Sequence, residues 1–373
     1  MKNKSKILIS ILGFSAGGAE ILPIRLANSL HDRGYTVGVH CTKPSADKSV
    51  RSRLHPGIPV YTTDRFWRMA LVLLHGYRVV NSHCTASQQL LVRVKRLVPF
   101  LRFRHIATSH GGYEGMPEAE ALALLRNVDG GVDAWTYVAD NNLPLFRLAG
   151  VAEDKLHKIG NAMEPPEDIQ PSSMTAYGIP QDAFVFSVIT RAVAKKGWPA
   201  CIAAVREARR ISGKDIHLLL GGRGEIYDRL LQESTEDFVH LVGEIERPCD
   251  VYAASHCGLL LSVLECAPLG IIEMYFADIP VVATDTGDVA EMLQFGDEQT
   301  GILVSLTADG QVPIPEAGRA IAEMTQNYTL YARCKAAASR KASTYRMDAV
   351  TDKYLSVYDE PVVERNANKE YKR

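Results

Sequence analysis

Two cations stand five residues apart in the middle of the chain, directly after an apolar run. Arg191 follows the run Val185–Thr190, and Lys196 comes just before Gly197. The fork of a guanidinium and the point charge of an ammonium together suit a diphosphate. The alternative, two solvated surface charges, fits the spacing equally well.

Two glutamates follow a second apolar run. Glu265 comes shortly after Leu259–Ser262, and Glu273 follows eight residues later, inside an expected helix. A carboxylate only accepts hydrogen bonds and therefore suits sugar hydroxyls, so Glu265 would face a hexose and Glu273 a ribose. The alternative for a helical glutamate is a solvated face. A solvated face is disfavoured for Glu273 because its neighbours in sequence are apolar: Ile271, Ile272, Met274 and Tyr275.

The start of that helix is a candidate phosphate site. The first N–H groups of a helix lack intrahelical partners and attract anions. The residues concerned are Pro268, Leu269 and Gly270. Pro268 has no N–H, so it contributes no donor to a phosphate.

The first half of the chain offers a glycine turn and a histidine loop. Gly17 and Gly18 precede a helical segment, where bare backbone N–H groups would approach an anion. They form no G-x-G-x-x-G dinucleotide pattern, so tight packing is the alternative. His110 would donate a hydrogen bond or move a proton near neutral pH. His83 is its rival, and a purely structural histidine is the alternative for both.

Short apolar runs alternate with helical periodicities through both halves, which indicates βαβ units and parallel sheets covered on both faces. The strands expected in the first half are Lys6–Leu12, Thr36–Cys41, Val79–Ser82, His105–Ser109 and Ala134–Val138. Those expected in the second half are Val185–Thr190, His217–Gly221, Val239–Leu241, Gly258–Ser262 and Ile279–Ala283. The expected fold class is therefore α/β, with two Rossmann-like, doubly wound domains.

Composition suggests the domain boundaries. A stretch with four prolines, residues 161–181, is typical of a linker between residues 1–160 and residues 182–345. Residues 346–373 are expected to form a helical tail that packs back toward the N-terminal domain. Ligands of open α/β sheets bind at the carboxyl ends of the strands, so we expect the site in a cleft between the two domains.

The charge balance differs between the two halves. The formal net charge of the 373 residues is −1, but residues 1–160 hold 21 Lys and Arg against 12 Asp and Glu, and the remainder holds 21 against 31. The near-neutral sum argues against a nucleic-acid partner. The seven cysteines include no C-x-x-C pair, which argues against a disulfide framework and for a reducing compartment.

The N-terminal sequence has the basic and apolar regions of a signal peptide, because three lysines precede the apolar run Ile7–Leu12. A buried first strand is the favoured interpretation, since helical spacing continues over Glu20–Leu30. No run approaches the ~18 consecutive apolar residues of a spanning helix. We expect a cytoplasmic protein that touches a membrane only from its side.

In their order and spacing, these residues resemble the family-4 retaining nucleotide-sugar glycosyltransferases, which have the GT-B fold. The match runs almost the length of the chain. It comprises Gly17-Gly18-Ala19-Glu20, His110-Gly111, Arg191 with Lys196-Gly197, Glu265 with Glu273, Ile279–Gly287, Glu291 and Gly301–Val304.

The resemblance implies roles for the second domain. It would bind a nucleotide sugar, most commonly a UDP-sugar, as a substrate, with no cofactor and no metal. Arg191 and Lys196 would stabilise the departing diphosphate. Glu265 would contact the donor hexose and Glu273 the ribose.

The resemblance also implies an acceptor side and a reaction. His110 would reach the sugar, and Gly17 and Gly18 would approach phosphates or acceptor. The reaction would be metal-independent hexosyl transfer with retained configuration to a glycan or lipid-linked acceptor, in cell-surface polysaccharide or lipopolysaccharide synthesis. The sequence contains no Asp-x-Asp metal motif.

The chain departs from the family pattern at a few positions. Asp278 stands where a glycine commonly precedes the Ile-Pro-Val-Val run, and Asp288 replaces the second glycine of a usual pair. These departures keep open a catalytically silent GT-B partner subunit. A sugar-nucleotide epimerase or hydrolase of similar two-domain architecture is the other alternative.

A basic stretch of the first half mixes cations with apolar residues, as at the surface of an anionic leaflet. The cations are Arg65, Arg68, Arg78, Arg93, Lys95, Arg96, Arg102 and Arg104; the apolar residues are Phe66, Trp67, Leu97, Val98, Phe100, Leu101 and Phe103. Docking there would bring the protein to a lipid-linked acceptor. The alternative is a packed helix with solvated charges.

Overall fold

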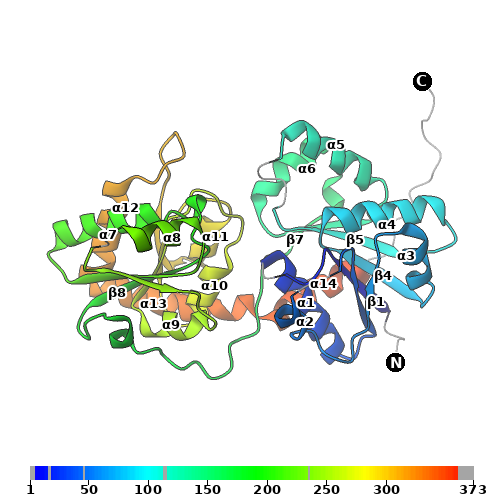
Figure 1. Cartoon of the computed structure of the whole chain (residues 1–373). Helices are drawn as coiled ribbons and strands as arrows, with labels where there is room; N and C mark the ends of the chain where they lie inside the picture. The colour runs from blue at the N-terminus through cyan, green and yellow to red at the C-terminus, as the bar shows by residue number, and fades with distance from the viewer. Residues whose placement is uncertain (1–4, 16–17, 45–46, 112–115, 234–235, 360–373) are drawn as a thin grey trace. The chain divides into compact units, whose positions relative to one another are not determined.

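The chain divides into two compact units in its computed structural model, which describes residues 5–15, 18–44, 47–111, 116–233 and 236–359 (Figure 1). Unit 1 comprises Met1–Gly160 and Met347–Arg373, and unit 2 comprises Asn161–Arg346. Residues 161–181, the expected linker, thus belong to unit 2, where Ile179 is buried in the core.

Unit 1 is built on a parallel sheet with the strand order β3-β2-β1-β4-β5-β6-β7. Its strands are β1 (Lys6–Ile11), β2 (Val37–Cys41), β3 (Val60–Thr62), β4 (Tyr77–Ser82), β5 (Arg104–Ser109), β6 (Ala134–Tyr137) and β7 (Leu156–Lys158). The five expected strands are present. The strands β3 and β7 were not predicted, because three residues at a sheet edge show no readable periodicity.

Helices cover this sheet. They are α1 (Gly18–Asp32), α2 (Lys48–Arg51), α3 (Phe66–Leu73), α4 (Thr85–Leu97), α5 (Glu118–Asp129), α6 (Leu143–Ala149) and α14 (Met347–Asp359). The last of these brings the C-terminal segment into unit 1. Tyr358 of α14 is buried, and its hydroxyl accepts a hydrogen bond of 2.8 Å from the Asn81 amide on β4.

Unit 2 repeats the architecture around a parallel sheet with the order β10-β9-β8-β11-β12-β15. These strands are β8 (Phe184–Ile189), β9 (Ile216–Gly221), β10 (Val239–Gly243), β11 (Cys257–Leu260), β12 (Val281–Thr284) and β15 (Gly301–Val304). A short hairpin pairs β13 (Gln294–Phe295) with β14 (Glu298–Gln299). The prediction of two doubly wound α/β domains is confirmed.

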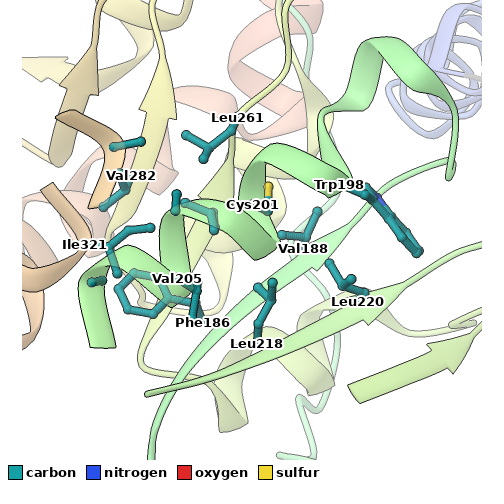
Figure 2. Close-up of a cluster of buried hydrophobic side chains, with 14 of the residues drawn as sticks. Phe186, Val188, Trp198, Cys201, Val205, Leu218, Leu220, Leu261, Val282 and Ile321 are labelled. Atoms are coloured by element: carbon teal, nitrogen blue, oxygen red, sulfur yellow. The ribbon is translucent and has the colours of Figure 1, made fainter. Parts of the chain in front are cut away.

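The helices of unit 2 pack apolar faces on the sheet. They are α7 (Trp198–Ser212), α8 (Glu225–Gln232), α9 (Pro248–Ala254), α10 (Leu269–Phe276), α11 (Val289–Leu293), α12 (Ile314–Gln326) and α13 (Tyr328–Lys341). Figure 2 shows part of the main core, where Cys201 and Val205 of α7 and Ile321 of α12 meet Leu218 and Val282 of the sheet.

Each sheet has one point where the strand order reverses. In unit 2, β8 lies between β9 and β11, so the chain moves outward in both directions from β8. In unit 1 the same reversal lies between β1 and β4. Loops at the carboxyl ends of the strands diverge at such a point and leave room for a ligand.

Candidate functional site

The site in unit 2 is an ion pair at the reversal point of its sheet. Lys196 lies in the loop that leaves β8, and Glu265 lies in the loop that leaves β11. The Lys196 Nζ atom donates to Glu265 Oε1 at 2.6 Å. Glu265 is only 7% exposed, and the Lys196 side chain is 16% exposed. Two residues far apart in sequence are thus paired where a ligand of a parallel sheet is expected.

A glycine makes the close approach of these two loops possible. Gly197, beside Lys196, has a φ of +68°, and a Cβ atom there would lie 1.9 Å from the carbonyl oxygen of Leu261. The two loops are also tied by a backbone hydrogen bond of 3.0 Å from the Val263 N–H to the Lys195 carbonyl. The backbone therefore fixes where the Lys196 side chain starts.

The loop that leaves β12 supports Glu265 from another side. The Glu265 N–H donates to the Thr286 hydroxyl at 3.2 Å, and the Asp288 N–H donates to the Cys266 carbonyl at 2.7 Å. At Gly287, with a φ of +58°, a Cβ would lie 2.4 Å from the Glu265 carbonyl oxygen. Three loops thus hold this carboxylate in one place.

Arg191 lies in the same loop as Lys196 but is exposed. Among the residues that the structure describes, no carboxylate forms an ion pair with it. The sequence analysis missed a second exposed arginine, Arg223, in the loop that leaves β9. The carbonyl of Arg223 accepts from the Ala192 N–H at 2.8 Å, so the two loops are in contact. The sequence pattern that could have indicated Arg223 is Gly221-Gly222-Arg223-Gly224, which directly follows an apolar run.

Those glycines also have a packing reason. Gly222 has a φ of +137°, and a Cβ there would lie 1.9 Å from the Thr190 carbonyl oxygen. At Gly224, with a φ of +143°, it would lie 2.5 Å from the Ala192 carbonyl oxygen. A side chain at either position would push the arginine loops of β8 and β9 apart.

Helix α10 begins next to the Glu265 loop. Pro268 is its N-cap and is buried, and Leu269 and Gly270 open its first turn. Glu273 lies one turn further and is half-buried. The pKa of the Tyr252 hydroxyl is raised first by its own burial and second by the negative charge of Glu273. The Glu273 carboxylate therefore lies near that hydroxyl. Glu273 therefore does not stand on a solvated face.

Asp278, where the family pattern commonly has glycine, has a φ of +57° and is exposed. Glycine adopts this left-handed conformation at the least cost, and aspartate is among the few other residues that tolerate it. The departure therefore keeps the local backbone that the pattern requires.

Unit 1 carries a histidine pair near its own reversal point. His83 follows β4 and His110 follows β5, and the His83 Nδ1 and His110 Nε2 atoms are 2.9 Å apart. Burial lowers the pKa of His110 to about 4, and burial and the neighbouring His110 lower the pKa of His83 still more clearly. Both rings are therefore neutral at pH 7, and one donates to the other.

The pair also determines which nitrogen of His110 carries its proton. The His83 Nε2 atom is buried without a hydrogen-bond partner among the described residues. A buried N–H donor without a partner is rarer than an unsatisfied acceptor, so we assign no proton to His83 Nε2. His83 then donates from Nδ1 to His110 Nε2. His110 consequently carries its proton on Nδ1 and presents that N–H as a donor.

Gly17 lies outside the described residues, and Gly18 is the first residue of α1. Near the carboxyl ends of β1, β2 and β3 the structure has a cavity of about 200 Å³ that the sequence analysis did not foresee. Its lining residues are Phe14, Cys41, Asp47, Lys48, Arg51, Val60 and Thr62. The Arg51 guanidinium lies over the Phe14 ring, 5.1 Å from its centroid, so the cavity combines an apolar wall with a cation.

Comparison with known proteins matches the fold and the segment that contains the unit 2 site residues. Residues 183–312, which include Arg191, Lys196, Glu265 and Glu273, match the family model of "Glycosyl transferases group 1". This segment is about a third of the chain. No curated protein matches the sequence.

Solved structures match along nearly the whole chain. HepE from Anabaena, in complex with UDP-glucose, is 18% identical with a TM-score of 0.75, covering 94% of this chain and 98% of its own. A glycosyltransferase from Rickettsia africae is 16% identical with a TM-score of 0.76, covering 95% and 98%. The lipopolysaccharide outer core galactosyltransferase WaaB is 12% identical with a TM-score of 0.69, covering 94% and 98%. The fold is GT-B, and these matches together support a glycosyltransferase.

Proposed function

We propose that the chain is a retaining glycosyltransferase that moves a hexose from a nucleotide diphosphate sugar, with UDP as the nucleotide, to a glycan or lipid-linked acceptor. The observation that carries the proposal is the Lys196–Glu265 pair at the reversal point of the unit 2 sheet. The segment that holds the pair matches a glycosyltransferase family model, and similar folds have been solved with UDP-glucose and with UDP.

Lys196 would act on the departing diphosphate. When the bond between the sugar C1 and the diphosphate breaks, negative charge builds on the phosphate oxygens, and a cation fixed in advance stabilises it without reorganising. Glu265 holds the ammonium in place before the donor binds. Arg191 is exposed in the same loop and would add the second cation, and Arg223 in the adjacent loop a third.

The carboxylates would orient the donor. Glu265 would accept hydrogen bonds from the hexose hydroxyls and Glu273 from the ribose. The first turn of α10, at Leu269 and Gly270, would face phosphate. With three arginine or lysine side chains available for the diphosphate, we propose transfer that needs no metal ion.

On the acceptor side, the Nδ1–H of His110 would donate to the sugar, and Gly17 and Gly18 would approach phosphates or acceptor. The acceptor hydroxyl would attack C1 from the face that the diphosphate leaves, pass its proton to the leaving phosphate oxygen, and so retain the configuration. The reaction would serve cell-surface polysaccharide or lipopolysaccharide synthesis, in the cytoplasm at the inner face of the membrane. None of the described helices has the length and hydropathy that crossing a bilayer requires.

Nucleotide release tests this function. UDP-glucose and other UDP-hexoses are incubated with the protein, with and without lipid-linked and glycan acceptors, and UDP is measured. Release that depends on acceptor supports the transferase. Release without acceptor indicates the hydrolase, conversion of the sugar on an intact nucleotide indicates the epimerase, and no turnover with any donor indicates the silent subunit.

A further inference from the structure

Helix α3 of unit 1 is apolar on the side that faces solvent. Seven of its eight residues, FWRMALVL, are apolar. Met69, Val72 and Leu73 point into the core, as a packed helix requires. Trp67, Leu71 and the following Leu74 are nevertheless 45%, 54% and 61% exposed. Their spacing of four and three residues places them on one stripe. A helix that is apolar all round is normally buried on all sides.

Helix α4 extends this surface. It packs beside α3 in the same layer of unit 1 (Figure 1). Leu97 at its end is 55% exposed, and Phe100, three residues on, is 75% exposed. Five of the nine large apolar side chains that the structure exposes therefore fall within residues 67–100. We call these five residues and the arginines around them the α3–α4 surface.

The charges of the segment that carries the α3–α4 surface, from residue 65 to residue 104, are of one sign. Between residues 65 and 104 the sequence has eight cations and no carboxylate. The structure removes two of the cations from the surface, because Lys95 pairs with Asp133 and Arg104 is buried. Six stay exposed: Arg65, Arg68, Arg78, Arg93, Arg96 and Arg102. None of these six has an ion-pair partner within the described part of the chain.

Several exposed arginines of unit 2 have ion-pair partners, although Arg191 and Arg223 at the candidate site have none among the described residues. Arg210 pairs with Glu207 and Arg319 with Glu316, each at 2.7 Å. Arg247 pairs with Asp250 at 2.5 Å. Two arginines of the α3–α4 surface instead lie over rings, Arg68 over Trp67 and Arg93 over Phe66, with 5.0 and 4.7 Å to the ring centroids, and Arg96 donates to the Asn127 carbonyl at 3.0 Å. Their charge is left for an external anion.

We propose that the α3–α4 surface docks on an anionic phospholipid bilayer. Arginines would meet lipid phosphates, and the aromatic and leucine side chains would enter the interface between headgroups and acyl chains. A second copy of the chain is disfavoured as occupant, because it would bring like charges together. A nucleic acid is disfavoured because the exposed leucines would gain no partner from it. The proposal specifies the surface for the membrane location proposed above, and its test needs no glycosyl transfer.

Vesicle flotation of the full-length protein tests the proposal. We expect binding to mixed phosphatidylcholine and phosphatidylglycerol vesicles, weakening with added salt, and little binding to pure phosphatidylcholine. Changing Trp67, Leu71 and Phe100 together to serine should lower the partition coefficient at least tenfold, since each large side chain contributes about fivefold when partly buried. The double change Arg68→Glu and Arg102→Glu should lower it by at least about tenfold.

Two matched variants serve as controls. Leu148→Ser removes an apolar side chain of unit 1 that is 57% exposed on α6, and Arg53→Glu reverses an exposed charge of the same unit. Both should float like the unchanged protein, and circular dichroism should show all variants folded. The proposal is overturned by equal binding to neutral and anionic vesicles, by equal losses in the controls, or by α3–α4 variants that float normally. It is also overturned if these variants dissolve a dimer or abolish nucleic-acid binding while vesicle binding persists. The result of the transferase assay is independent of these outcomes, so failure of membrane docking and failure of the proposed function can be told apart.

Discussion

The proposed site residues are held in position, before any ligand binds, by residues far away in sequence. Lys196 is paired with Glu265, and His110 with His83. The sequence could predict that Arg191, Lys196 and Glu265 follow strands, because the apolar runs before them are clear. It could not predict the histidine pair, which depends on β4 lying next to β5 with Ser82 opposite Ala107.

Replacing Lys196 by alanine should lower turnover by about two orders of magnitude, the scale of losing one transition-state donor. The matched control is Lys195→Ala, which removes an exposed lysine from the same loop and should leave turnover within about twofold. The measurement is UDP release at saturating donor and acceptor. Near-normal turnover in Lys196→Ala would remove that residue from the site.

His83 should act as a positioning residue through the tautomer of His110. His83→Leu removes the donor to His110 Nε2, so kcat should fall about tenfold, in the range for losing one oriented hydrogen bond. In His83→Asn an amide N–H can replace Nδ1–H, and much of the activity should return. Steady-state kinetics of both variants test this. Equal activity of the two variants, or a change confined to thermal stability, would leave His83 a packing residue only.

Among the helices and strands, the strands that end at the site were readable from the sequence, and so was α4, but α3 was not. Helix α3 escaped prediction because it is short and seven of its eight residues are apolar, so its sequence shows no run of polar residues that marks a solvent face. The same property makes its solvent-facing stripe unusual. Arg223 was missed because a glycine-rich turn after β9 matches no phosphate motif, although its glycines are fixed by contacts with the β8 loop.

Gly197 should be intolerant of a side chain, and Gly213 provides the matched comparison. Both have positive φ angles, +68° and +62°, but a Cβ at Gly213 would meet nothing within 4 Å. Gly213→Ala should cost about 1–2 kcal/mol of unfolding free energy from the backbone alone. Gly197→Ala should cost more, because the loops of β8 and β11 must separate, and it should also lower turnover. Urea unfolding and UDP release measure the two effects. Equal costs would show that the loop contact adds nothing.

At the scale of the whole molecule, the net charge of −1 is a near-cancellation. The surplus of cations in residues 1–160 includes the α3–α4 surface, whereas the surplus of carboxylates lies in the remainder. Composition alone showed this asymmetry. It could not show that Lys95 and Arg104 are used inside unit 1, since that depends on tertiary contacts with Asp133 and α14.

Unit 1 should be more sensitive to acid than unit 2. Burial lowers the pKa of His105 to about 3 and that of His110 to about 4, and it lowers the pKa of His40 and His83 as well, whereas in the described part of unit 2 it lowers the pKa of two half-buried histidines, His240 and His256. Between pH 4 and 6.5 the unfolded chain therefore binds more protons than the folded one, so stability falls as the pH falls through this window. Each such group contributes up to about 1.4 kcal/mol per pH unit.

Peptide-resolved hydrogen exchange from pH 7 to pH 4.5, corrected for the intrinsic rate, measures this difference. The amides of β4 and β5 should lose protection before those of β8 and β9. The variant His105→Gln, which has no titrating ring, should show a shallower loss in unit 1. Parallel loss in the two units, or earlier loss in unit 2, would contradict the prediction.

Transfer of a labelled sugar to a lipid-linked acceptor tests the proposed function. The full-length protein is mixed with UDP-hexose labelled in the sugar, anionic vesicles that contain a lipid-linked acceptor, and a chelator of divalent cations. We predict that label moves into the lipid fraction, that one UDP is released for each sugar transferred, and that the product keeps the anomeric configuration of the donor. Label recovered as free sugar, label that stays on the nucleotide with every acceptor, or an inverted product would contradict the account.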